Sequence, residues 1–564
     1  MMNVTAAFGL LAVLASISNS LCEEKPTVHL SPGVEMQGEK QFSSKYPERS
    51  GYAYYGIRYG TARRFEHSTE NTDFGYLQDP AHPKQGFACP QSSAAIGLAE
   101  APQALAMDED CLYLDIFVPS TAKTSQRLLP VMVFIYGGAF QIGNKDECNG
   151  TFLALETDAV YVALNYRVSI FGFLSTGDEN LPGNYGVGDC KTALNWIVKH
   201  IEKFSGDVNQ ITVFGQSAGA ILTSTLYMDP ESRERIRAAL ALSGSILMDN
   251  ALKSDPKPVP MELAEKVNCT RRSTREMVHC LKDVPVSVLL QAAKKLEPGN
   301  PETIPYGLVV DHVHIKELPR LALKHAGTTS KKSTLISGYL REDNSALLGM
   351  SYPQLFDPAV PVTYGLLKEI VARHFIPTSD RCTTLKYDQA ERAMNYYSIS
   401  ETDERSEMMR KVILLSTDAV WGYPPMKELS IYAQNMPANG GENQFYLISF
   451  DQKFMDYGAF HGLDMLYIFG DELNKLYYQL PFNATVQTSL LTMMRQIVHN
   501  GRMDGPAFNR EGAHLELPQK GLWELGHTDV RARVKFWDSV ADTPCPKSES
   551  RLYEREAFRS SEEL

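Results

Sequence analysis

The stretch from Gln210 to Ala220 constrains the fold of this chain more than any other part of it. It begins with an apolar run of strand type, residues 211–214, and continues into the motif G-x-S-x-G at residues 215–219. The Ala-Ile-Leu that follows is typical of a helix start. Strand, tight turn and helix form the context of a nucleophile elbow, in which the turn lifts the serine clear of the backbone. The two glycines leave room for such a turn. The pattern therefore makes Ser217 a candidate nucleophile.

Strands and helices alternate along much of the chain. Helical periodicity is clear over residues 191–204, and residues 486–499 predict an amphipathic helix. Between 246 and 440 the pattern is less regular and more helical. Apolar runs of strand type occupy residues 112–118, 129–135, 158–164, 237–242, 333–337 and 444–449. This alternation predicts an α/β fold with a mostly parallel sheet and helices on both faces.

Composition bounds the class of protein. The chain has 564 residues, 43% of them hydrophobic and 22% charged, which is globular composition with ample core. The net charge of −12 is spread along the chain, and no basic or aromatic cluster is present for nucleic acid. Without an internal repeat or a convincing linker, we expect one catalytic domain over residues 21–545 and a polar tail over 546–564.

The N-terminus has the pattern of a signal peptide, over residues 1–20. Ala6 to Ile17 is an apolar run too short for a membrane span, and small polar residues follow it. No later stretch approaches 18 apolar residues, so we expect a soluble protein of the secretory pathway. Glycosylation sequons at Asn149, Asn268 and Asn483 fit that route. The last four residues, Ser-Glu-Glu-Leu, resemble a retrieval tail, which makes the lumen of the endoplasmic reticulum the alternative to secretion.

The cysteine pattern argues for disulfides rather than a metal site. None of the nine cysteines has C-x2-C spacing, so neither a zinc site nor another cofactor is predicted. In an oxidising compartment, disulfides are the default state. Cys89 and Cys111 bracket a natural closed loop.

A serine hydroxyl needs a base, an orienting acid and donors for the oxyanion. His461 follows a strong late strand within a glycine-flanked loop, which makes it the candidate base. Glu342 and Asp343 come just after the strand at 333–337, and either carboxylate can reach an imidazole. The turn at Gly137-Gly138-Ala139 follows a buried strand, so its backbone N–H groups are candidate oxyanion donors together with that of Ala218.

Taken together, five segments resemble the type-B carboxylesterase family, which includes carboxylesterases, cholinesterases, insect juvenile hormone esterases and the non-catalytic neuroligins. The resemblance covers roughly residues 50 to 540 and implies an α/β-hydrolase fold, serine esterase activity on small-molecule esters, and no cofactor. The five segments are E-D-C-L-Y-L at 109–114, Y-G-G-A-F at 136–140, N-Y-R at 165–167, G-Q-S-A-G at 215–219 and G-A-F-H at 458–461.

The resemblance also implies roles for individual residues. Ser217 matches the family's nucleophile and His461 its general acid/base. The family's acid, usually Glu, falls on Asp343, with Glu342 as the alternative. The oxyanion donors fall on Gly138, Ala139 and Ala218, and the methyl group of Ala139, where the family usually has Gly, should narrow the pocket beside the acyl carbon.

Implied structural features are the disulfides Cys89–Cys111 and Cys269–Cys280 and an ion pair between Arg167 and Asp189. The resemblance assigns no partner to five cysteines, namely Cys22, Cys148, Cys190, Cys382 and Cys545. The oligomeric state is likewise left open.

Among the activities of this family, hydrolysis of neutral, largely apolar esters fits the sequence best. Residues 90–110 contain no aromatic residue that could hold a quaternary ammonium group by a cation–π contact, and Gln216 replaces the family's common acidic residue. A cholinesterase-like or juvenile hormone esterase-like enzyme is the alternative. An adhesion protein of neuroligin type is disfavoured, because Ser217 and His461 are both present and no membrane span is found.

Overall fold

The computed structural model describes most of the chain between residues 26 and 543. The predicted signal segment, the polar tail, Cys22, Cys382 and Cys545 all lie outside the described residues. The described ranges are 26–43, 45–78, 85–92, 106–122, 127–296, 304–325, 332–376, 383–435, 442–450, 458–470, 483–518 and 520–543.

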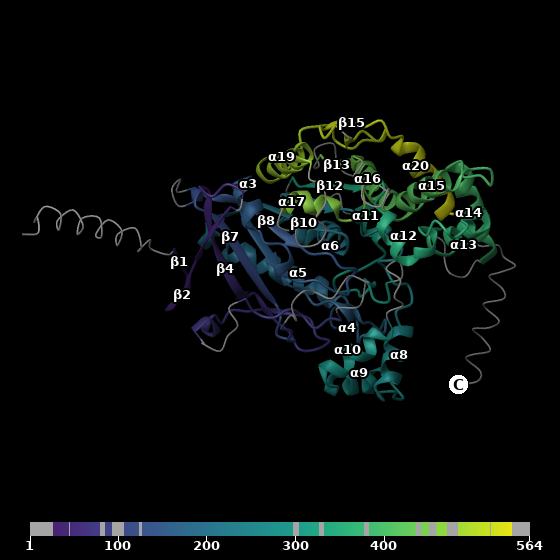
Figure 1. Ribbon diagram of the computed structural model, residues 1–564. Helices are drawn as coiled ribbons and strands as arrows, with labels where there is room; N and C mark the ends of the chain where they lie inside the picture. The colour runs from purple at the N-terminus through teal and green to yellow at the C-terminus, as the bar shows by residue number, and fades with distance from the viewer. Residues whose placement is uncertain are drawn as a thin grey trace, which may run out of the picture.

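A large mixed sheet forms the centre of the fold (Figure 1). Its strands lie in the order β15-β14-β13-β12-β11-β10-β8-β9-β7-β4-β3. The pairs from β9 to β14 are parallel, whereas the strands at both edges are antiparallel. The strands are β3 (Glu39–Phe42), β4 (Ser50–Arg58), β7 (Tyr113–Pro119), β8 (Leu129–Ile135), β9 (Val160–Leu164), β10 (Gly206–Gln216), β11 (Ala238–Leu242), β12 (Thr334–Leu340), β13 (Gln444–Ile448), β14 (Leu515–Leu517) and β15 (Glu524–Leu525). The predicted α/β fold with a mostly parallel sheet is confirmed.

The central strands are buried along their whole length, as their apolar sequences predict. Every residue of β8, β9, β11, β12 and β13 is buried. Helices cover both faces, which removes both sides of these strands from water. Figure 1 shows α3 (Thr151–Thr157) and α19 (Ala484–Asn500) on one side of the sheet and α5 (Tyr185–His200) and α6 (Ala218–Met228) on the other.

The strand order reverses between β8 and β10. The chain places β9 on one side of β8 and the later strand β10 on the other. At such a switch point the loops after neighbouring parallel strands leave in opposite directions and open a crevice at their carboxyl ends, where ligands bind in open α/β sheets. Ile135 at the end of β8 is in register with Gly215 near the end of β10. The predicted elbow and the predicted oxyanion turn therefore leave the sheet side by side at the carboxyl ends of β8 and β10.

Two helical additions lie beside the sheet. The first is a lobe at the bottom of Figure 1, formed by α8 (Pro258–Lys266), α9 (Thr274–Asp283) and α10 (Val286–Lys294). The second comprises α12 (Ser345–Ser351), α13 (Tyr364–His374), α14 (Thr383–Tyr396) and α15 (Arg405–Thr417). It has its own apolar cluster, which also includes Trp537 from α20 (Val530–Ala541).

Both predicted disulfides are confirmed. Cys89 is bonded to Cys111 and Cys269 to Cys280. Cys148 and Cys190 are buried free thiols.

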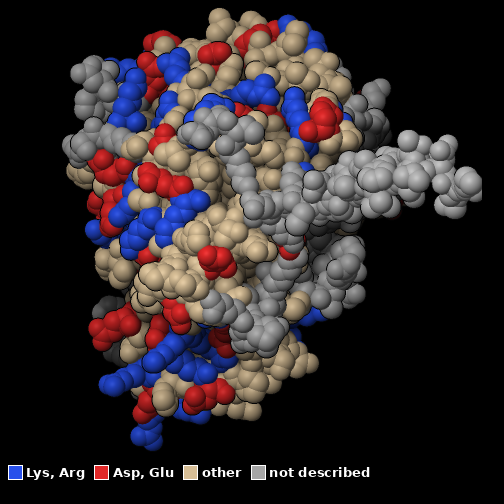
Figure 2. All heavy atoms as spheres, turned by 90° about the vertical axis from the view of Figure 1, so that its left-hand side faces the viewer, with Lys and Arg blue, Asp and Glu red and all other residues tan. Residues whose placement is uncertain are grey.

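The surface is charged and mixed. On the face shown in Figure 2, Lys and Arg side chains lie among Asp and Glu side chains. Across the described ranges we find no helix both long and apolar enough for a membrane crossing.

Candidate active site

Ser217 occupies a strained turn between β10 and α6. Its backbone has φ 58° and ψ −124°, a conformation that non-glycine residues rarely adopt. Two backbone hydrogen bonds hold the turn: Ser217 N–H donates to the carbonyl of Leu242 (2.9 Å), and Ile221 N–H donates to the carbonyl of Ser217 (3.0 Å). This is the geometry of a nucleophile elbow.

The two glycines of the motif are needed because the backbones approach closely there. A Cβ on Gly215 would lie 2.4 Å from the carbonyl oxygen of Gly219, and a Cβ on Gly219 would lie 2.0 Å from that of Ile135. Both distances are far shorter than a van der Waals contact. Without side chains at these positions, α6 can start directly against the end of β8.

The turn after β8 lies against the serine. A Cβ on Gly137 would be 3.2 Å from Ser217 Cβ. Gly138 has φ 102°, and Ala139, with φ 54°, adopts a left-handed conformation that is unusual for alanine. Among the described residues, none supplies a hydrogen-bond acceptor to the N–H groups of Gly138, Ala139 or Ala218. These three donors are therefore open to an oxygen atom beside Ser217.

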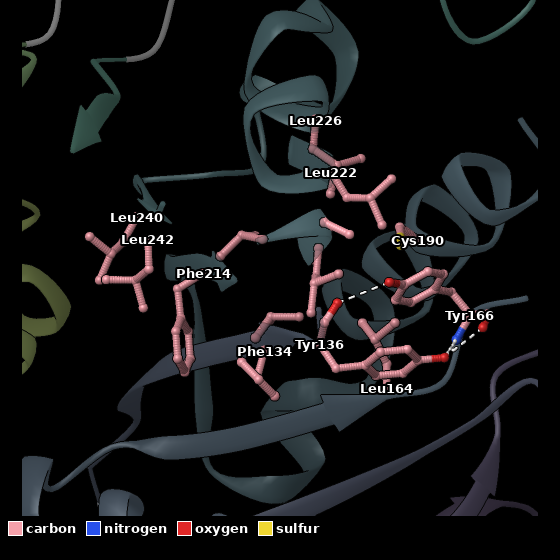
Figure 3. Packing of buried hydrophobic residues seen from close by; sticks show 14 of the residues in the cluster. Phe134, Tyr136, Leu164, Tyr166, Cys190, Phe214, Leu222, Leu226, Leu240 and Leu242 are labelled. Carbon is pink, nitrogen blue, oxygen red and sulfur yellow. Dashed lines mark hydrogen bonds between the residues drawn. The ribbon is translucent and has the colours of Figure 1, made fainter. Parts of the chain in front are cut away.

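Two tyrosines fix this turn to the core (Figure 3). The Tyr136 hydroxyl donates to the carbonyl of Tyr166 (2.6 Å), and the Tyr166 hydroxyl donates to the carbonyl of Tyr136 (2.9 Å). Their rings stack with centroids 4.3 Å apart. Burial raises the pKa of both hydroxyls well above the ordinary value, so they remain protonated donors. The pair ties the end of β8 to the loop after β9.

Asp343 and His461 are in direct contact. His461 Nδ1 lies 2.6 Å from Asp343 Oδ1, and the backbone N–H of His461 donates to the carbonyl of Asp343 (3.0 Å). The other carboxylate oxygen of Asp343 accepts from the Ser243 hydroxyl (2.5 Å) and from the Leu340 N–H (2.9 Å). Asp343 is fully buried. A carboxylate fixed in this way sets the tautomer and the orientation of the imidazole.

Glu342 contacts the backbone of the segment just before His461 rather than the imidazole ring. Its Oε2 accepts a hydrogen bond from the Ala459 N–H (3.2 Å), and a Cβ on Gly458 would lie only 2.6 Å from that oxygen. Of the two adjacent carboxylates, it is thus Asp343 that lies at the ring.

Gln216 contacts the other nitrogen of the histidine. Its side-chain Nε2 lies 3.0 Å from His461 Nε2. Within the described residues, Ser217 Oγ makes no hydrogen bond to the ring. The sequence places Gln216 beside the nucleophile, but only the structure places its amide on the histidine.

Trp421 packs against the histidine ring, a contact that no sequence motif indicates. It belongs to η5 (Asp418–Gly422), a π-helical turn, and its ring centroid is 4.1 Å from that of His461. The indole N–H donates to Asn344 Oδ1 (3.0 Å). Trp421 thereby fixes the face of the imidazole, as Asp343 fixes its edge.

Asp464 is a second buried carboxyl group near the histidine. Its Oδ2 has no hydrogen-bond partner among the described residues. Burial raises its pKa to about 7, with a further increase from the charge of Asp343 and an opposing effect of His461. The motif from Gly458 to Asp464 contains this residue, but the sequence does not show that its carboxyl group is buried.

The remaining predicted residues lie away from this site. Arg167 and Asp189 form the expected buried ion pair, with two contacts of 2.8 Å. Asn149 and Asn268 are exposed, and Asn483 caps α19 through its side-chain oxygen. No group of three or more His, Cys, Asp or Glu side chains in the described part of the chain could hold a metal ion.

Fold and site together define an α/β hydrolase with Ser217, Asp343 and His461 in the chain order of that fold. The model of the carboxylesterase family matches residues 24–520. The chain therefore belongs to the carboxylesterase family, whose members include carboxylic ester hydrolases of the serine-esterase type.

Individual relatives are distant. Bile salt-activated lipase of Mus musculus is 29% identical over 409 residues, which cover 70% of this chain and 66% of the relative. Carboxylesterase 4A of Bos taurus is 28% identical over 430 residues, covering 73% and 76%. A carboxylic ester hydrolase of Bombus ignitus is 40% identical over 204 residues, 36% of each chain. The chain spans 66%, 62% and 60% of three bile salt-activated lipases that it matches.

Proposed function

We propose that this protein is a serine carboxylesterase that hydrolyses neutral, largely apolar esters through an acyl-enzyme on Ser217. The observation that carries the proposal is the 2.6 Å contact between Asp343 and His461 Nδ1, in a ring whose other nitrogen lies 3.0 Å from Gln216, the residue before Ser217. Membership in the carboxylesterase family supports the reaction class.

In the proposed mechanism Ser217 Oγ attacks the ester carbonyl while His461 Nε2 takes the hydroxyl proton. Asp343 stabilises the imidazolium that forms. The N–H groups of Gly138, Ala139 and Ala218 donate to the oxyanion of the tetrahedral intermediate. The imidazolium returns the proton to the departing alkoxide, which leaves as the alcohol. His461 then deprotonates a water molecule that attacks the acyl-enzyme, and the carboxylic acid leaves.

Two features favour a neutral substrate. Gln216, the residue before Ser217, is uncharged, whereas many members of the family have an acidic residue at this position. The segment 90–110 has no aromatic side chain for a quaternary ammonium group.

Residues 21–545 would form the hydrolase domain of a protein of the secretory pathway. The two disulfides support an oxidising compartment, since they rarely persist in a reducing one. The signal-like segment 1–20 and the three sequons support the same route.

The Ser-Glu-Glu-Leu end leaves the lumen of the endoplasmic reticulum as the alternative to secretion. Deleting these four residues should increase secretion if they act as a retrieval signal, and unchanged secretion would argue against it.

The test of the reaction combines kinetics with covalent labelling. Ser217→Ala should lower hydrolysis of a p-nitrophenyl ester by at least about a thousandfold, and a fluorophosphonate should label Ser217 in the unmodified enzyme. Ser287→Ala, at an exposed serine of α10, is the matched control and should change neither.

Full activity of Ser217→Ala, or a label on another residue, would contradict the mechanism. Substrate preference is tested separately with choline esters and neutral esters of similar size. A clear preference for choline esters would overturn the proposal of a neutral substrate and leave the mechanism intact.

A further inference from the structure

We propose that Gln216 is a positioning residue that occupies the base nitrogen of His461 in the free enzyme and must release it before Ser217 can be activated. The inference rests on the proposed function, because it takes His461 as the base. The observation that supports it is the distance of 3.0 Å between Gln216 Nε2 and His461 Nε2.

The hydrogen bonds around Asp343 determine which nitrogen of His461 is the acceptor. Asp343 Oδ2 already accepts from the Ser243 hydroxyl and the Leu340 N–H, and Oδ1 faces His461 Nδ1. Because a carboxylate only accepts, the proton between the two groups belongs to Nδ1. In the neutral ring Nε2 is then an acceptor with one in-plane lone pair. The amide of Gln216 donates to that lone pair.

The same lone pair must accept the proton of the Ser217 hydroxyl during acylation. It cannot serve both donors at once, so the amide and the hydroxyl compete for it. Ser217 Oγ makes no hydrogen bond to the ring within the described residues, which agrees with occupation by Gln216. The contact therefore adds to the barrier for acylation until a substrate displaces the amide.

The backbone places both competitors beside the ring. Gln216 ends β10 and Ser217 begins the elbow, where the positive φ of 58° breaks the alternation of side chains along the strand. The amide of Gln216 lies between two glycines: a Cβ on Gly137 would be 3.1 Å from its oxygen, and a Cβ on Gly462 would be 3.8 Å from its nitrogen. A side chain can turn more easily beside glycines than beside larger residues.

An amide has a further property that a carboxylate lacks. When Nε2 is protonated during the reaction, rotation of the amide presents its oxygen as an acceptor. A glutamate at this position would accept only, and its charge would favour the imidazolium over the neutral ring. The other acidic groups near the ring are Asp343 after β12, Asp464 on α17 (Leu463–Phe469) and Glu342 against Gly458.

Two variants test the competition. Gln216→Met keeps the length of the side chain and removes its donor, so the second-order rate of Ser217 labelling by a fluorophosphonate should rise about three- to tenfold, the range that corresponds to one neutral hydrogen bond. Gln216→Glu should move the acid limb of the kcat/KM profile for a neutral ester to higher pH. Gln291→Met, at an exposed glutamine of α10, is the control and should alter neither.

A labelling rate in Gln216→Met that is equal to or below that of the unmodified enzyme would overturn the inference. An unshifted acid limb in Gln216→Glu would also overturn it, and because that variant is nearly isosteric it remains informative if Gln216→Met folds poorly. In both cases labelling of Ser217 in the unmodified enzyme would leave the proposed mechanism standing. Absence of that label would instead contradict the mechanism itself.

Discussion

Asp343 and Glu342 show how strongly a single position along the chain decides the role of a side chain. The two carboxylates are adjacent in sequence, yet one contacts the imidazole and the other contacts the backbone at Gly458 and Ala459. The two residues lie in the turn after β12 (Thr334–Leu340), where Asp343 N–H donates to the carbonyl of Leu340 (3.1 Å), so their side chains leave the backbone in different directions.

We expect Asp343→Asn to lower kcat/KM by about 10³- to 10⁴-fold, since an amide at that place no longer favours the productive tautomer of His461. Glu342→Gln keeps an acceptor for the Ala459 N–H and should cost less than about tenfold. Steady-state kinetics on one neutral ester compares the two variants. A larger loss in Glu342→Gln would move the orienting acid to Glu342.

Asp464 should make stability depend on pH. Its native pKa of about 7 lies above its ordinary value of 3.8, so the native protein holds a proton that the unfolded chain releases between about pH 4 and pH 7. The contribution of this group to stability therefore falls as the pH rises through that window.

Asp464→Asn removes this dependence. The free energy of unfolding of the variant, relative to the unmodified protein, should increase between pH 5 and pH 7 by up to about 1.4 kcal/mol per pH unit. Denaturant unfolding at several pH values measures the difference. Asp255→Asn, at an exposed aspartate, should show no such trend. A difference that is flat or falls with pH would contradict the assignment of a raised pKa.

At the scale of elements, the start of α6 is the most constrained point of the fold. The helix begins against the end of β8, because Gly219 has no side chain to collide with the carbonyl of Ile135. The second constraint is the Tyr136–Tyr166 pair, which holds the turn after β8 in place.

Gly219→Ala should destabilise the protein by about 1–3 kcal/mol, because its Cβ would force α6 away from β8. It should also lower kcat, since Ser217 would move with the helix. Gly365→Ala is the matched control: Gly365 is exposed in α13 and a Cβ there would meet nothing within 4 Å. That change should raise stability by up to about 1 kcal/mol. Thermal unfolding measures the stability of both variants, and ester hydrolysis measures their kcat. Equal changes in the two variants would refute the steric argument.

At the scale of the whole molecule, the sheet provides the reactive groups while the helical additions provide surrounding packing. The α8–α10 lobe supplies none of the residues that contact Ser217 or His461 in the described structure. Its disulfide links residues 11 positions apart.

We therefore expect the double change Cys269→Ser and Cys280→Ser to lower stability by up to about 3 kcal/mol, by releasing chain entropy in the unfolded state. The activity per folded molecule should remain within about twofold. Denaturant unfolding and kinetics on the folded fraction test the two parts. A large loss of kcat with unchanged stability would mean that the lobe shapes the active site.

Much of this fold could be predicted from local sequence. The apolar runs at 129–135 and 444–449 correspond to β8 and β13, and the amphipathic run at 486–499 corresponds to α19. These segments could be predicted because a strand buried on both faces is a continuous apolar run, and a helix buried on one face has apolar residues at a period of 3.6. The antiparallel pairing at the sheet edges and the second apolar cluster around Trp537 could not be predicted in this way. Both depend on which segments pack together across long distances in the sequence.

For the site, the sequence by itself determined the elbow, the glycine turn and the identities of Ser217 and His461 as candidates, because each depends on small residues and strand ends that lie close together along the chain. Only the tertiary structure decided that Asp343 rather than Glu342 lies at the ring, that Trp421 covers its face and that Gln216 occupies its second nitrogen. These contacts join residues far apart in sequence, and such residues come into contact only when the whole sheet has assembled.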